Sequence, residues 1–237
     1  QDDESYFDMA DRREVGRTTF NALFRHIPCY SIHAGSNGGA RRVEASICYD
    51  ENRQAMGAPA LVGITYSAGD DVLVTRDGDV FGNRWRDARQ PAGAGDVSMW
   101  LEHCAALIPV ESEREHVFDV MACKYQRPNV KINHAVLHGG DEGCGKDTLW
   151  APLLWAVCGP SLRNRGILDN DTLGSQWGYQ LEAEIIILNE LKEPDARERR
   201  ALANKLKPII AAPPEMIPIN RKGLHPYQMV NRCFVLA

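Results

Sequence analysis

The carboxyl-terminal half of the chain alternates short apolar runs with longer segments of helical periodicity. Apolar runs of strand length fall at residues 132–137, 182–190 and 231–237. Between them, apolar positions recur every three or four residues over 146–158, which predicts a buried helix ending at Gly159. Residues 195–210 predict a basic helix. Strands that alternate with helices favour an α/β fold with a mainly parallel sheet.

The preceding residues have two other patterns. Residues 98–128 predict two helices, with Val117, Val120 and Met121 on one face and Pro128 ending the second helix. Within residues 1–90 we expect a short helix over 18–27, and strands over 41–50, 60–69 and 71–85. The last of these contains an Asp-Gly hairpin signal.

A connector rich in Pro, Gly and Ala over 89–97 suggests a boundary. We therefore expect a β-rich module over 1–90, a small helical region over 91–128 and an α/β core over 129–237. The first residue is not Met and the last residues are apolar, so we expect both ends to be cut from a longer chain.

Composition places this chain among ordinary globular proteins. It has 237 residues, of which 44% are hydrophobic and 25% charged, and a formal net charge of -5. It contains no apolar run of about 18 residues, so we expect no membrane contact. Seven cysteines without a C-x-x-C spacing fit neither a disulfide framework nor a zinc finger, and they favour a reducing, cytoplasmic compartment.

The glycine-rich segment after the first apolar run matches the pattern G-x-x-x-x-G-K. Glycines let backbone N–H groups turn toward phosphate oxygens, the helix amino terminus attracts anions, and the lysine reaches the terminal phosphates. The residues expected around a nucleotide are Gly140, Asp141, Glu142, Gly143, Cys144, Gly145, Lys146, Asp147 and Thr148. The alternative is a glycine turn before a core helix, with a solvated lysine.

Asp147 departs from the pattern, in which a Ser or Thr hydroxyl binds Mg²⁺. A carboxylate is also a hard oxygen ligand, so Asp147 is a candidate metal ligand, and Thr148 offers a hydroxyl one place later. The simpler interpretation is that Asp147 only stabilises the helix amino terminus.

The second apolar run ends in Asn189 and Glu190. A phosphate-loop ATPase needs polar or acidic groups at the end of a neighbouring strand, to hold Mg²⁺ and to polarise the attacking water. We therefore assign catalytic roles to Lys146, Asn189 and Glu190, with Glu190 also near the metal. The alternative is a core strand followed by a solvated Glu.

Residues from about 83 to 237 resemble the helicase superfamily three ATPases, in particular phage and poxvirus-type primase–helicase proteins. The resemblance rests on the segments NRW, LEHCAALIPVESEREHVFDVMACKYQRPNVKINHAVLHGGDEGCGKDTLW, EIIILNE and LKPIIAAPPEMIPINRKGLHPYQMVNRCFVLA. It implies an AAA+-like P-loop fold, ATP and Mg²⁺ as cofactors, a homo-hexamer that moves on single-stranded DNA, and a phage or prophage protein in a bacterial host.

By the same resemblance, Lys207, Arg221 and Lys222 match the region that contacts DNA, and residues 231–237 match a sensor strand that stops before its Asn. Residues 1–90 would then be a linker or the tail of a primase module. Two other functions stay open. One is a nucleotide-binding module without hydrolysis, since Asp147 and Asn189 both alter the metal positions. The other is a small-molecule kinase.

Overall fold

The computed structural model describes residues 4–31, 39–175, 178–189, 196–211, 213, 216–222 and 225–237. The chain forms two compact units. The first comprises residues 1–64 and 71–84, and the second comprises residues 65–70 and 85–237. The segments 65–70 and 85–90, grouped with the amino-terminal module by their sequence, therefore pack with the second unit.

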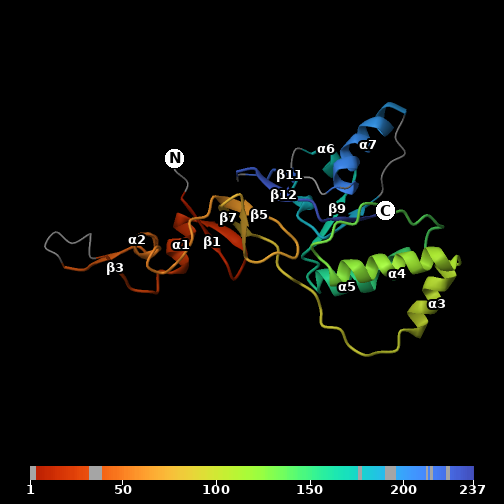
Figure 1. Ribbon diagram of the computed structural model, residues 1–237, viewed down its shortest axis with the longest axis horizontal. Helices are drawn as coiled ribbons and strands as arrows, with labels where there is room; N and C mark the ends of the chain where they lie inside the picture. The colour runs from red at the N-terminus through yellow and green to blue at the C-terminus, as the bar shows by residue number, and fades with distance from the viewer. Residues whose placement is uncertain are drawn as a thin grey trace. The chain divides into compact units, whose positions relative to one another are not determined.

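In its described residues, the first unit consists of small sheets, in which β1–β2, β3–β4 and β6–β7 are antiparallel, and two short helices (Figure 1). Strands β1 and β2 pair with each other, β3 pairs with β4, and the order of the third sheet is β5-β7-β6. The elements are β1 (Ser5–Asp8), β2 (Arg13–Gly16), α1 (Arg17–Leu23), β3 (Cys29–Ser31), β4 (Arg41–Val43), α2 (Ala45–Asn52), β5 (Gly63–Thr65), β6 (Leu73–Arg76) and β7 (Asp79–Asn83).

The Asp-Gly hairpin is confirmed. Asp77 and Gly78 both have positive φ angles, of 52° and 90°, between the paired strands β6 and β7. Two successive positive φ values are those of a type I′ turn, whose twist matches that of the strands it joins.

The strand expected over residues 41–50 is wrong in its second half, which forms α2. The side-chain oxygen of Asn21 accepts a hydrogen bond from the backbone N–H of Ser46, at 2.8 Å, in the first turn of that helix. Because this acceptor lies 25 residues earlier in the chain, the local pattern carries no sign of it.

The second unit is built on a four-stranded sheet in the order β8-β13-β10-β9, with every pair parallel. Its strands are β8 (Ala135–Val136), β9 (Arg165–Leu168), β10 (Ile185–Leu188) and β13 (Phe234–Leu236). The predicted α/β class and parallel sheet are confirmed. Because all strands run in one direction, the residues that follow them gather at one edge of the sheet.

Two hydrophobic clusters cover the two faces of this sheet. Phe234 belongs to one cluster and its neighbour Val235 to the other, as side-chain alternation along a strand requires. The first face carries α3 (Ser98–Leu107), α4 (Glu111–Gln126) and α5 (Lys146–Cys158), and the second carries α7 (Ala196–Ile210) and the hairpin of β11 (Met216–Ile219) and β12 (Tyr227–Val230) (Figure 1). The short helices α6 (Asn170–Gly174) and η1 (Tyr179–Leu181) follow β9.

Strand β8 is shorter than the apolar run of residues 132–137. Only Ala135 and Val136 pair with β13, where they lie opposite Val235 and Leu236. Ile132 is buried all the same, as part of the core beneath the helices. The apolar pattern therefore reports burial here rather than strand length.

A buried ionic network holds together the amino ends of the strands in the second unit. Glu184, fully buried before β10, accepts hydrogen bonds from the indole N–H of Trp85 at 2.8 Å and from the guanidinium of Arg89 at 2.5 Å. The buried ammonium of Lys124 lies 3.9 Å from the same carboxylate, and Asn164 donates to it at 3.2 Å. This network anchors the segment 85–90 in the core.

Among the helices that the structure describes, none has both the length and the apolar character that crossing a bilayer requires.

Candidate functional site

The glycine-rich segment lies at the carboxyl edge of the parallel sheet. It leaves β8 at Leu137 and ends at Gly145, after which α5 begins at Lys146. Gly143 and Gly145 have positive φ angles of 75° and 91°, which side-chain-bearing residues rarely adopt. The arrangement is therefore strand, glycine turn and helix, as the sequence predicted.

The backbone of this segment presents a run of free hydrogen-bond donors. The N–H of His138 donates to the carbonyl of Ala237 at 2.8 Å, and that of Leu149 donates to the carbonyl of Gly145. Between them, no backbone N–H of residues 139–148 donates a hydrogen bond to any described part of the chain. Free amides at a helix amino terminus, reinforced by the helix dipole, fit an anion such as a phosphate.

Lys146 places its cation within the same segment. Its ammonium donates to the carbonyl of Gly140 at 2.5 Å and to that of Asp141 at 3.1 Å. The side chain therefore folds back over the turn, toward the backbone that precedes it. An incoming anion would meet this cation together with the free amides.

Asp147 and Thr148 occupy the first turn of α5, and both are exposed. Their oxygens are thus open to solvent and to a metal ion. Within the described ranges, no group of three His, Cys, Asp or Glu side chains is arranged to hold a metal by itself.

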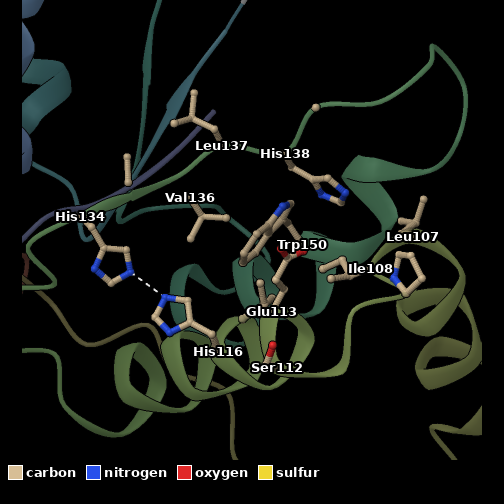
Figure 2. Close-up of a pocket in the computed structure, with 14 residues that line it drawn as sticks. Leu107, Ile108, Ser112, Glu113, His116, His134, Val136, Leu137, His138 and Trp150 are labelled. Carbon is tan, nitrogen blue, oxygen red and sulfur yellow. Dashed lines mark hydrogen bonds between the residues drawn. The ribbon is translucent and has the colours of Figure 1, made fainter.

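A cavity of about 580 Å³ opens beside the turn, between β8, the loop joining α3 to α4, and α4 itself (Figure 2). Ile108, Val117, Val136 and Trp150 provide apolar walls. Gly139 belongs both to the cavity lining and to the glycine-rich segment. The cavity therefore continues directly from the amides, and its size suits a nucleoside.

Three histidines face this cavity. Figure 2 shows His116 on α4 and His134 before β8 pointing at each other, with 2.9 Å between their Nε2 atoms. Burial, and then the neighbouring His116, lower the pKa of His134. Burial, and then the charge of Lys146, lower the pKa of His138, whose buried Nδ1 has no hydrogen-bond partner within the described residues.

The ends of β10 and β9 lie at the same edge of the sheet. Asn189 is exposed after β10, and its backbone N–H donates to the carbonyl of Leu168 at 2.8 Å. Glu190, the predicted catalytic acid, lies outside the described residues. Asp169, after β9, caps α6 by accepting from the N–H of Thr172 at 2.8 Å, and these hydrogen bonds lower its pKa.

The three predicted nucleic-acid contacts lie on the other face of the sheet. Lys207 is exposed in the last turn of α7, and Lys222 is exposed in the connection between β11 and β12. Arg221 is half-buried, 3.6 Å from the carboxylate of Glu182. Two of the three cations are thus exposed to solvent, and the third already has an anionic partner.

Sequence reasoning missed two kinds of residue near the site. His103, on α3, contacts the carbonyl of Gly145 from 42 residues away. His116, His134 and His138 line the cavity, although their spacing follows no nucleotide-binding pattern. Only tertiary packing brings them together, so no local signal marks them.

Comparison with known proteins gives a family model and several solved structures. The model of a family of unknown function, DUF5906, matches residues 137–237. An apo structure of the NrS-1 C-terminal region is similar with a TM-score of 0.60 and 18% identity, over 85% of this chain and 50% of that chain. A second apo structure of that region gives a TM-score of 0.64 and 17% identity, over 98% and 52%.

At these identities the likeness establishes the fold alone. This chain spans about half the length of those solved structures. A search of curated proteins gives no match.

Proposed function

We propose that residues 138–148 form a phosphate-binding loop and that this chain carries the ATP-binding, ATP-hydrolysing domain of a primase–helicase. The observation that carries the proposal is the run of free backbone amides between His138 and Leu149, with the ammonium of Lys146 beside it. It lies at the carboxyl edge of a parallel sheet, where ligands of such folds bind.

The residues present fit a nucleotide with its metal. The amides of the loop and Lys146 hold the phosphates, while the apolar cavity from Ile108 to Trp150 takes the base and the sugar. Asp147 and Thr148 would hold Mg²⁺, which would neutralise charge on the phosphates. Asn189, at the end of β10, orients water together with Glu190.

For the protein as a whole, the proposal follows the resemblance to superfamily three helicases and agrees with the parallel α/β fold. The protein is of phage or prophage origin and forms a homo-hexamer in the cytoplasm of a bacterial host. A primase module is joined to it through the amino-terminal residues. Lys207, Arg221 and Lys222 contact single-stranded DNA, which hydrolysis moves along the protein.

A second candidate is a module that binds ATP without hydrolysing it. It is favoured by the residues at the metal positions, where Asp147 stands in place of a hydroxyl and Asn189 in place of a carboxylate. Both candidates use the same loop, so one binding experiment tests them together.

The test is calorimetric titration of Mg-ATP into the wild type, Lys146→Ala and the control Lys205→Ala, which changes an exposed lysine of α7. We expect binding to be lost in Lys146→Ala alone. Equal affinities in all three proteins would refute the phosphate loop.

The rate of ATP hydrolysis with and without single-stranded DNA, measured in a longer chain, then distinguishes a motor from a module that binds ATP without hydrolysing it. A phosphorylated small-molecule product would instead indicate a kinase.

A further inference from the structure

The first unit contains a groove of about 900 Å³ bounded by α1, β4 and the start of α2. Four arginines line it, namely Arg17, Arg25, Arg41 and Arg42. Glu44 is the acidic residue of the lining, and its carboxylate accepts a hydrogen bond from the amide of Asn21 at 2.7 Å. The lining therefore has a clear excess of positive charge.

This excess contrasts with the rest of the unit. Residues 1–64 and 71–84 contain nine arginines, no lysine and twelve acidic residues. Four of the nine arginines line the groove, against one of the twelve acids. Positive charge is thus gathered at one place on a unit that is acidic on balance, which favours a local anionic partner.

Most of these arginines are available to a ligand. Arg17 is paired with Glu4 at 2.5 Å. Arg25, Arg41 and Arg42 are exposed and form no ion pair within the described part of the chain. The planar guanidinium group binds phosphate oxygens through two parallel hydrogen bonds, which a lysine cannot do.

The groove also has an apolar wall. Phe24 and Ile27 line it, and 37% and 45% of their surfaces are exposed. The Phe24 ring lies against that of Phe20, with centroids 4.7 Å apart, which holds it in place. An exposed, supported aromatic ring beside free arginines is the combination with which proteins bind unpaired bases and their backbone.

From these features we propose that the groove binds single-stranded nucleic acid. The bases of a duplex are stacked inside the helix and cannot reach Phe24, and the carboxylate side chains of an acidic peptide offer no flat ring to stack on it. The site is separate from the cations proposed on α7 and the β11–β12 hairpin, and it needs no nucleotide at Lys146.

The experiment measures fluorescence anisotropy of a labelled single-stranded oligothymidylate titrated with the intact chain, without ATP. To isolate the groove, all variants carry Lys207→Ala, Arg221→Ala and Lys222→Ala. Arg25→Ala/Arg42→Ala removes two groove charges, and Arg13→Ala/Arg53→Ala removes two exposed charges of the same unit outside it.

We expect the groove variant to bind at least about tenfold more weakly than the control. The slope of the logarithm of the binding constant against the logarithm of the salt concentration, called the salt slope here, should become shallower by about 1.4, because two phosphate contacts are lost. Phe24→Ala should weaken binding about tenfold while keeping the salt slope. Circular dichroism checks that each variant is folded.

Four outcomes would overturn the proposal. The first is equal weakening of binding by the groove and control variants, and the second is no binding by the folded background protein. The third is a duplex bound as tightly as the single strand, with no effect of Phe24→Ala on binding. The fourth is displacement of the oligonucleotide by polyglutamate at equal charge concentration. Since ATP is absent, failure here leaves the function proposed for Lys146 unaffected.

Discussion

The imidazole of His103 contacts the last glycine of the loop, with Nε2 3.0 Å from the carbonyl oxygen of Gly145. Because a carbonyl only accepts, Nε2 carries the proton. The ring also fills the space in which Gly145 would carry a Cβ, which would lie 2.6 Å from the His103 ring. Helix α3 thereby fixes the turn that starts α5.

Loss of this contact should weaken nucleotide binding without unfolding the chain. His103→Ala removes one of the two donors to the carbonyl of Gly145, the other being the N–H of Leu149, and we expect Mg-ATP affinity to fall about fivefold, the value of one hydrogen bond. His103→Gln, which keeps a donor, should lose less. Calorimetry measures both, with the exposed His225→Ala as control. Equal affinity in all three variants would contradict the role of His103.

Asp147 and Asn189 should compensate for each other. We expect Asp147→Ser/Asn189→Asp to keep Mg-dependent ATP binding better than either single change, because the double variant restores one carboxylate near the metal. Asp119→Ser, on the exposed side of α4, is the control. The hypothesis fails if the two single variants and the double variant all bind as the wild type does.

Glu184 should contribute far more to the free energy of unfolding than Asp87, the exposed carboxylate that also pairs with Arg89. Glu184→Ala leaves Arg89 and Lys124 without their buried anion, and we expect a loss of about 3–5 kcal/mol in the free energy of unfolding. Asp87 also pairs with Arg89, at 3.0 Å, but is largely exposed, so Asp87→Ala should cost less than about 1 kcal/mol. Urea unfolding measures the two changes. Similar losses would show that burial is not the deciding factor.

His134 should make stability depend on pH. Its pKa is lowered in the fold, so the unfolded chain binds more protons between the folded and the unfolded pKa. Stability therefore rises with pH through that window and is lost below it. We expect His134→Gln to flatten the fall in stability between about pH 7 and about pH 5, where an ordinary His titrates. An unchanged slope, equal to that of His225→Gln, would contradict this.

The sequence predicted those parts of the fold in which local pattern and tertiary packing agree. Helix α5 begins at Lys146 and ends before Gly159 as expected, because glycines mark both of its ends. Its two tryptophans differ. Trp150 is buried, whereas Trp155 is 55% exposed. Periodicity shows that a helix has an apolar face, but not how much of that face its neighbours cover.

The residues that prediction missed depend on partners far away in the chain. Strand β9, which contains Arg165 and Gly166, has too few apolar positions to stand out, and it forms because β10 pairs with it. Glu184 looks like the polar start of an apolar run. Its role depends on hydrogen bonds from Trp85 and Arg89, which lie about 100 residues earlier in the chain.

The segment 65–70 has a consequence for synthesis on the ribosome. The hydroxyl of Thr65 donates to the carbonyl of Gln228 at 3.1 Å, Tyr66 donates to Asn164, and Arg232 is paired with Asp70 at 2.9 Å. These partners are translated about 100 to 160 residues later. The emerging chain must therefore hold this segment undocked until residue 232 has left the exit tunnel. The second unit thus completes its core only after translation has passed that point, and not progressively from its amino terminus.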